Sequence, residues 1–528
     1  MKLNIWYIGI IACSLFSTVA CKDWLDTTSE TQVEASDLLN SEDGFKDAIT
    51  GVYINMGSED AYGKNFTWYA NDLAAFPYKI QGTISNYIIW QDHRYSTASA
   101  QTYFNNMWAK SYNIIANVNE ILRYLEKNKN KLPDVVHDLM KGEMLGIRAY
   151  IHFDLLRMYG LSNWDENADK YTVPYVTEFT KEQTPQRTYE ETSRLLFEDL
   201  ENALTYLKND PIRGNLSTDY NESINQDGFW SGRDKRMNYY AVEALAARIC
   251  MWIGNDEKRE KAFEYAKDVI DNGPATWVDL NEFTSLSVND YRDWSFSTEH
   301  LFSLEVMGLI NSINGYLFVT EHDYQGIKIE SSTVLDVLFK PYEERVIQEE
   351  GWFYDENNPT GGPDGDGWIW KDAEIETIIL PSANDIRYTT LLVPVDGGSA
   401  YNCWKLYQSS NYTSKFRNRI PMIKLSEMYY IMAEYYIRKG QNDLALSTLD
   451  IVRKHRGITE DYNPSTTNAE EELTLEYMRE FMGEGQIFYY WKRTGINCPV
   501  TTFQLSPENL IYLYPQEEIS EGGRHQDL

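Results

Sequence analysis

Residues 142–160 read GEMLGIRAYIHFDLLRMYG. Its apolar positions recur at helical spacing and it stops at a glycine, so it predicts a helix over about 134–160 that ends at Gly160. Glu143 and Arg148 lie five residues apart in it, and we expect both to pair with neighbouring segments. Arg157 lies near the helix C-terminus, where a cation suits the helix dipole. The charges of this helix therefore predict a structural rather than a catalytic role.

Further helices are predicted on both sides of this stretch. Apolar residues recur at helical spacing over 38–56, 101–127 and 188–207, and the last segment begins with a capping-type threonine, Thr188. Trp108, Trp252 and Trp491 fall on helical periods, so we expect them in the core.

Two helical pairs are similar to tetratricopeptide repeats. They span about 237–271 and 421–456, and small residues stand where helices could pack closely. The second pair keeps the spacing of that repeat at four positions, which are Ala433, Tyr436, Ala445 and Leu449. The equivalent alanines of the two pairs, 262 and 445, are 183 residues apart, so the repeats are not a regular tandem array.

A long insertion separates the pairs. Residues 275–415 are rich in Trp, Gly, Asp and Asn, contain short β-prone runs, and include a segment at 357–367 that can only be loop. The sequence thus predicts an all-α dominated fold, a tetratricopeptide-like helix-pair scaffold with an irregular, loop-rich excursion. A single domain would cover 38–528, with the scaffold at about 38–274 and 416–528 and the insertion at about 275–415.

The N-terminus predicts export. Lys2, an apolar run and a small-residue stretch before Cys21 are typical of a secretory signal over residues 1–20. A cysteine at this point indicates lipidation of Cys21, which would leave residues 21–37 as a lipid-anchored tether. The alternative is an ordinary signal peptide with an incidental cysteine.

The amino-acid composition limits the classes of molecule that the protein could bind. The formal net charge is −32, which disfavours nucleic acid and anionic lipid headgroups. Cys250, Cys403 and Cys498 are scattered and show no disulfide or metal spacing, so we expect buried small apolar residues.

Enzyme motifs are missing from the sequence, and we predict a protein that is not an enzyme and requires no cofactor. No nucleophile elbow, zinc-protease motif, Walker loop or dinucleotide fingerprint occurs, and no pair among the seven histidines has ligand spacing. Asp364 and Asp366 alternate with glycines and could offer oxygens to a structural calcium ion, although a plain turn is the other interpretation.

Several segments together resemble the SusD/RagB family. They are the stretch at 142–160, the run from Ile420 to Tyr429, the segment 449–457, and the C-terminal marks Glu480-Phe481, Glu484-Gly485, 491–493 and 513–518. Two positions depart from the family pattern, since Lys424 replaces the usual Arg and Gln516 stands where a second Pro is common. The resemblance implies an outer-membrane, lipid-anchored and surface-exposed lipoprotein that captures oligosaccharide and delivers it to a SusC-like TonB-dependent transporter. A peptide-binding RagB-like protein and a structural or adhesive lipoprotein remain as alternatives.

Aromatic residues suggest how a ligand would be held. The chain has 39 Tyr and 15 Trp against 20 Phe, and a sugar can stack its apolar face on a flat ring while its hydroxyls find polar partners. Two irregular regions supply candidate ligand-binding residues: Trp68, Tyr69, Asn71, Asp72, Tyr87, Trp90 and Arg94 in the first, and Tyr291, Trp294, Trp352, Trp368 and Trp370 in the second.

Overall fold

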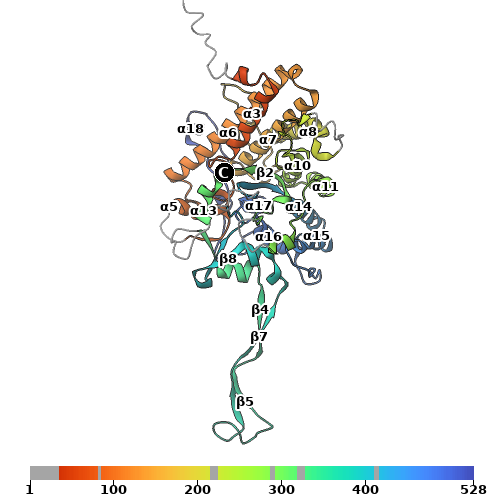
Figure 1. The fold of residues 1–528 in the computed structure, drawn as a ribbon. Coiled ribbons are helices and arrows are strands. Elements are labelled where there is room, and N and C mark those ends of the chain that lie inside the picture. The colour runs from red at the N-terminus through yellow and green to blue at the C-terminus, as the bar shows by residue number, and fades with distance from the viewer. Residues whose placement is uncertain are drawn as a thin grey trace, which may run out of the picture.

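The computed structural model describes residues 35–80, 85–214, 224–285, 292–317, 327–408 and 416–527. The predicted signal sequence, Cys21 and Tyr291 lie outside these ranges. Helices form most of a rounded body, and a long thin β-hairpin projects from the end of the body opposite α3 (Figure 1). The predicted helix-dominated fold class is therefore confirmed. None of the helices in these ranges combines the length and apolarity that crossing a bilayer needs.

The N-terminal helices begin where the sequence offers capping side chains. Ser41 caps α3 (Glu42–Met56), Thr97 caps α6 (Ala98–Lys127), and Thr188 forms a capping box with Glu191 at α8 (Tyr189–Tyr206). These side chains satisfy backbone N–H groups that have no partner within the helix. The predicted helices at 38–56, 101–127 and 188–207 are thus confirmed with small shifts at their ends.

The stretch 142–160 lies in α7 (Asp134–Tyr159), which packs against α6 on one side and α8 on another. Its glycines permit close approach. A Cβ on Gly146 would lie 2.7 Å from Met237 Cγ, and one on Gly142 would lie 2.6 Å from Leu207 Cγ. The expected ion pairs are present, because Glu143 accepts hydrogen bonds from Arg233 (2.6 Å) and Arg148 donates to Asp199 (2.8 Å).

Both predicted helix pairs are present. The first is α10 (Tyr239–Ile253) with α11 (Asp256–Asn272), and the second is α14 (Leu425–Arg438) with α15 (Asn442–Lys454). Helix α11 packs against α14, so the two units are neighbours despite their separation in sequence. Helices α16 (Ala469–Phe481) and α17 (Gln486–Thr494) follow, and shorter helices complete the chain: α4 (Ala70–Ala75), α5 (Ser85–Gln91), α12 (Leu280–Ser285), α13 (Leu309–Leu317) and α18 (Gln516–Ser520).

The insertion is more ordered than the sequence suggests. Strand β2 (His300–Glu305) pairs with β10 (Arg419–Lys424), so residues 419–424 form a strand before the second helix pair begins. A four-stranded antiparallel sheet has the order β1-β3-β9-β8, with bounds β1 (Tyr78–Ile80), β3 (Ile327–Glu330), β9 (Ala400–Cys403) and β8 (Leu392–Val395). The short β-prone runs of the insertion thus form strands. Strands β2 and β3 find partners far away in sequence, whereas β8 and β9 pair as sequence neighbours.

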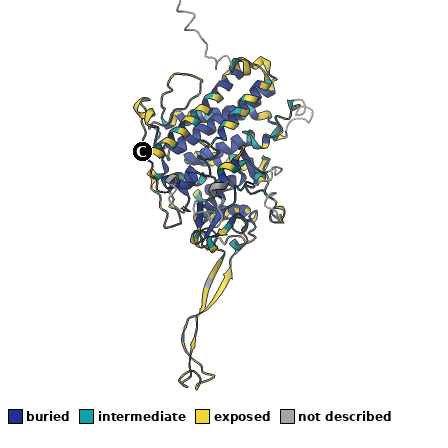
Figure 2. Cartoon of the chain, turned by 60° about the vertical axis from the view of Figure 1, so that its left-hand side comes forward, coloured by how far each residue is buried: buried dark blue, intermediate teal, exposed yellow. Residues whose placement is uncertain are grey.

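The projecting hairpin, here called the arm, spans residues 341–380. Its lower part, the stem, pairs β4 (Tyr342–Gln348) with β7 (Glu374–Ile379), and its tip pairs β5 (Gly351–Tyr354) with β6 (Trp368–Lys371). The arm is exposed along its length, whereas the helices of the body have buried inner faces (Figure 2). Leu380 N donates to Pro341 O (2.9 Å) and closes the base of the arm.

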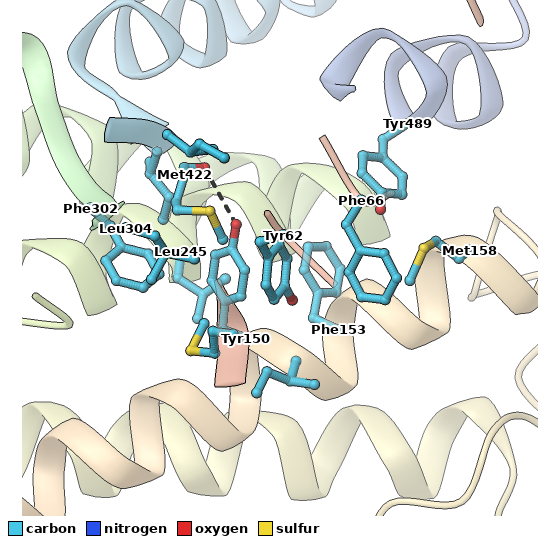
Figure 3. Close-up of a cluster of buried hydrophobic side chains, with 14 of the residues drawn as sticks. Tyr62, Phe66, Tyr150, Phe153, Met158, Leu245, Phe302, Leu304, Met422 and Tyr489 are labelled. Atoms are coloured by element: carbon cyan, nitrogen blue, oxygen red, sulfur yellow. Dashed lines mark hydrogen bonds between the residues drawn. The ribbon is translucent and has the colours of Figure 1, made fainter. Parts of the chain in front are cut away.

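An aromatic cluster joins the parts of the body. Tyr150 of α7 contacts the ring of Tyr62 (5.5 Å between centroids) and that of Phe302 in β2 (5.4 Å), and its hydroxyl lies 3.4 Å from Met422 O (Figure 3). The helix at 142–160 therefore contacts the N-terminal segment, the insertion and the strand before the second pair. Trp108, Trp252, Trp491 and the three cysteines are all buried, as expected.

Candidate functional site

The first group of candidate ligand residues lies inside the body. Trp68, Tyr69, Tyr87 and Trp90 are almost completely buried, and the ring of Trp90 contacts those of Tyr103, Phe104 and Tyr512. Trp68 Nε1 donates to Gly63 O (2.9 Å). A ring covered by other side chains offers no face to a sugar. Their assignment to a ligand surface is therefore corrected to a core role.

The polar candidates beside these rings are also internal. Asn71 Nδ2 donates to the hydroxyl of Tyr489 (2.9 Å), and its Oδ1 accepts from Tyr512 (2.8 Å). Asp72 accepts from the backbone N–H groups of Gly483 and Gly485, each at 3.1 Å. Burial raises the pKa of Asp72 to about 7, against the opposing effect of these hydrogen bonds. Asp72 therefore ties α4 to the segment before α17, and Asn71 ties α4 to α17 itself and to Tyr512. Their ligand role is corrected in the same way.

Arg94 and Trp294 lie in different environments, one exposed and one buried. Arg94 is exposed and pairs with Asp92 (2.5 Å). Trp294 is buried in a small core with Val278, Phe283, Phe296, Ile386 and Leu391. It is therefore corrected to a core residue. Tyr291 lies outside the described residues.

The remaining candidates come together on the arm. Trp352 of β5 lies opposite Trp370 of β6, and Tyr354 lies opposite Trp368. Because side chains alternate along a strand, positions two apart share a face, so these four rings form one surface, the arm aromatic face. Trp352 is 53% exposed, and the other three rings are also exposed.

The rings of the arm aromatic face are paired edge to face. The centroids of Trp352 and Trp370 are 5.6 Å apart with planes at 75°, and those of Tyr354 and Trp368 are 5.6 Å apart at 62°. Trp370 Nε1 donates to Asp372 Oδ1 (3.1 Å), which places a carboxylate at the rim. Flat apolar surface beside hydrogen-bonding groups is what stacking of a pyranose needs.

Tyr354 was not predicted as a ligand residue. The signal for it was present, since the aromatic runs Trp352-Phe353-Tyr354 and Trp368-Ile369-Trp370 flank a Gly-rich loop, and that pattern is typical of a β-hairpin. Reading the two runs as paired strands would have placed Tyr354 on the same face as the tryptophans.

The loop at the tip of the arm requires glycine. Gly362 and Gly367 have φ of +87° and +80°, and a Cβ on Gly367 would lie 2.6 Å from Tyr354 Cε2. Asp366 Oδ1 accepts from the backbone N–H of Trp368 (3.1 Å), so this carboxylate stabilises the turn. The described residues include no group of three or more His, Cys, Asp or Glu side chains placed to hold a metal ion.

A buried ionic network fixes the insertion to the scaffold. Glu480 of α16 accepts from Arg456 (2.9 Å) and Lys424 (2.8 Å), and Arg387, which follows the arm, lies 3.2 Å from the same carboxylate. Burial opposes ionisation of Glu480, but the charges of Arg456, Lys424, Lys405 and Arg387 outweigh it and hold its pKa well below its usual range. Glu480-Phe481, which resembles the family pattern, and Lys424, which differs from it, therefore both lie in the core.

Comparisons with known proteins agree with this architecture. Residues 23–221 match a family model described as "Starch-binding associating with outer membrane", and residues 395–505 match one described as "SusD family". No curated protein sequence matches the chain.

Solved structures share the fold. A SusD superfamily protein from Bacteroides thetaiotaomicron is 19% identical with a TM-score of 0.65, and the match covers 92% of this chain and 100% of that one. One from Bacteroides vulgatus is 18% identical with a TM-score of 0.66, covering 92% and 98%. A SusD-like carbohydrate binding protein from the same species is 14% identical with a TM-score of 0.60, covering 91% and 96%.

Proposed function

The chain belongs to the SusD/RagB family, and on that premise we propose that it is a glycan-binding lipoprotein of the cell surface. It captures oligosaccharide without cleaving it and delivers the ligand to a SusC-like TonB-dependent transporter in the outer membrane. The family description of outer-membrane association and starch binding supports this assignment, as does the similarity to the SusD-like carbohydrate binding protein of Bacteroides vulgatus. The absence of a catalytic motif in the sequence is consistent with capture rather than turnover.

The observation that carries the proposal is the exposure of the arm aromatic face. Trp68, Tyr69, Tyr87 and Trp90 of the body are buried, yet Trp352, Tyr354, Trp368 and Trp370 lie together in solvent. Exposed aromatic side chains on one face are typical of a binding surface. The rim carboxylate of Asp372 offers an acceptor for sugar hydroxyls.

Anchoring belongs to the same proposal. A lipid on Cys21 would hold the protein at the membrane, and exchange of Cys21→Ala should release it from the membrane fraction and remove the lipid from its mass. Retention of the exchanged protein in the membrane fraction at unchanged mass contradicts the anchor.

Ligand binding is tested with matched variants of the arm. The mature lipoprotein in detergent is screened on glycan and peptide arrays, and the selected ligand is titrated by calorimetry against Trp352→Ala, Trp368→Ala and Phe353→Ala. Phe353 lies between Trp352 and Tyr354 in β5, but on the opposite face of the strand. Phe353→Ala therefore controls for the loss of an aromatic ring from the same strand. Truncation of a central stacking ring is expected to cost about 2 kcal/mol, roughly a thirtyfold loss of affinity.

The outcomes separate the candidate functions. Unchanged binding in both tryptophan variants places the ligand away from the arm aromatic face, and equal losses in all three variants indicate a general disturbance of the tip. Selection of peptides alone favours the RagB-like alternative. Cleavage of the ligand during the titration contradicts capture without turnover.

A further inference from the structure

A cavity opens on the body where the C-terminal ends of α7 and α17 meet the segment that follows α17. Its volume is about 550 Å³, which lies within the range of about 300–1,000 Å³ that is typical of small-ligand sites. Residues from three segments line it, namely 161–170 after α7, 491–497 at the end of α17, and 505–511 around the short turn Pro507–Leu510. None of these segments belongs to the arm, so the cavity is separate from the arm aromatic face.

The charged side chains that line the cavity are all basic. They are Lys170, Lys492 and Arg493, and no Asp or Glu of the described residues lines it. The whole chain has 80 acidic residues against 48 lysines and arginines, so the charge of this cavity is opposite to that of the protein. A cleft lined by charge of one sign concentrates ligands of the other sign. The cavity therefore favours an anionic ligand.

The three cations differ in how far the protein itself neutralises them. Arg493 pairs with Glu434, whose Oε2 lies 2.7 Å from Nη2 of the arginine. Lys492 is buried, and its Nζ donates to the backbone carbonyl of Arg157 (2.7 Å) rather than to a carboxylate. Lys170 is exposed and forms no ion pair within the described residues. Lys170 is therefore the cation with which a bound anion can pair directly.

Lys492 gives a second reason to expect an anion. Burial, together with the charge of the neighbouring Arg157, holds the pKa of Lys492 well below its usual range. A negative charge in the cavity would favour the ammonium form of this lysine, since an opposite charge nearby stabilises a charged group. The carboxylate that the described residues do not place beside Lys492 could thus come from a ligand.

Neutral groups in the same cavity suit a sugar. The side-chain amides of Asn163 and Asn497 are exposed and form no hydrogen bond within the described residues, so they can donate to hydroxyl groups and accept from them. Leu505, Leu510 and Ile511 add apolar surface. A sugar ring that bears a carboxylate, hydroxyls and apolar C–H groups matches this combination.

We propose that this cavity binds a uronic acid residue of a glycan, with Lys170 pairing with the sugar carboxylate and with Asn163 and Asn497 hydrogen-bonded to its hydroxyls. The choice of a sugar rests on the proposed function, whereas the preference for a carboxylate rests on the lining of the cavity. The body thereby offers a second glycan site, and its ligand carries a negative charge.

Calorimetry on the mature lipoprotein in detergent tests the proposal with charged and neutral probes. The charged probes are the disaccharides of galacturonic acid and of glucuronic acid, and the neutral probes are the same disaccharides with each carboxylate reduced to an alcohol. At least one charged probe should bind about tenfold or more tightly than its neutral counterpart, because it adds hydrogen bonds between charged groups. Raising NaCl from about 0.05 M to about 0.5 M should weaken that binding about threefold, because salt screens an exposed charge pair.

Matched lysine variants locate the site. Lys170→Ala should weaken binding of the charged probe about tenfold, and Lys170→Arg should retain it. Lys181→Ala is the control, since Lys181 is an exposed lysine of the same connecting segment but does not line the cavity, and this variant should bind like the parent. Glycan capture at the arm is measured separately with the tryptophan variants and the array-selected ligand, so either proposal can fail without the other.

Several results would contradict a uronic acid site in the cavity. Equal affinity for charged and neutral probes, no binding of either charged probe, full binding by Lys170→Ala, or an equal loss in Lys181→Ala would each overturn the proposal. Tighter binding of trialanine, which offers a carboxylate without a sugar ring, would overturn it as well.

Discussion

The body and the arm use the same aromatic residue types in opposite surroundings. In the body, Trp90 is packed among the rings of Tyr103, Phe104 and Tyr512, whereas in the arm Trp352 is 53% exposed and touches mainly its cross-strand neighbour. An irregular, aromatic-rich segment is therefore not by itself a ligand surface. Its role depends on whether segments that are distant in sequence pack over it.

The largest expected difference between the body and the arm is in the free energy of unfolding, and it arises from the ionic network of the body. Glu480→Ala would leave Arg456, Arg387 and Lys424 buried without their shared carboxylate, and such a loss is expected to cost about 5 kcal/mol of unfolding free energy. The matched exchange Glu376→Ala, on the exposed stem, should change it by less than about 0.5 kcal/mol. Urea unfolding measures both, and similar values for the two variants would contradict the assignment of Glu480 to the core network.

The next largest effect compares two tryptophans. Trp90→Ala removes a fully buried ring and is expected to lower the unfolding free energy by about 4 kcal/mol, because it leaves a cavity. Trp352→Ala removes an exposed ring and should cost less than about 1 kcal/mol. Equal losses of melting temperature would show that the tip of the arm is part of the cooperative core, against its description as a separate projecting element.

Local patterns predicted much of the scaffold. The capping residue Thr188, the helical spacing in 142–160 and the small residues Ala262 and Ala433 each encode their element within a few neighbouring positions. Candidate site residues were harder to place because burial depends on long-range contacts. Asn71, for example, is held by Tyr489 and Tyr512, more than four hundred positions away.

The arm shows the opposite case. The sequence does reveal the loop at 357–367, but the segments on either side of it were interpreted as irregular structure. They pair with each other as the strands of the arm. A two-stranded ribbon has few contacts beyond its own register, so hairpin periodicity was the only available signal. That signal would have placed Tyr354 with the tryptophans.

A smaller effect is expected within the tip. Gly367 and Gly365 both have positive φ, but only a Cβ at Gly367 would press against Tyr354 Cε2 (2.6 Å), since the nearest atom at Gly365 is 3.9 Å away. Gly367→Ala should therefore weaken the tip by about 2 kcal/mol and Gly365→Ala by about 1 kcal/mol. Hydrogen exchange at residues 351–371 should be faster in Gly367→Ala, with the exchange of α7 unchanged. Identical exchange in the two variants would argue against close packing of the loop on Tyr354.

The smallest predicted effect concerns pH and the first helix pair. Burial and the neighbouring Asp268 raise the pKa of Glu243 from 4.5 to about 8. A carboxyl group with a raised folded-state pKa contributes its full stability below pH 4.5 and loses it as the pH rises towards about 8. Glu243→Gln lacks this loss, so its stability relative to the parent should increase by roughly 1–2 kcal/mol between pH 5 and pH 6.5. A pH-independent difference between the two melting curves would contradict the raised pKa.

Removal of the arm tests the central comparison most directly. Pro341 and Leu380 are hydrogen-bonded neighbours, so residues 342–379 can be replaced by a short Gly-Ser linker without separating the ends. The body should keep its melting temperature within a few degrees, because its core and ionic network lie elsewhere, while calorimetry should show loss of binding of the array-selected glycan. Full binding by the shortened protein, or collapse of its melting temperature, would contradict the account.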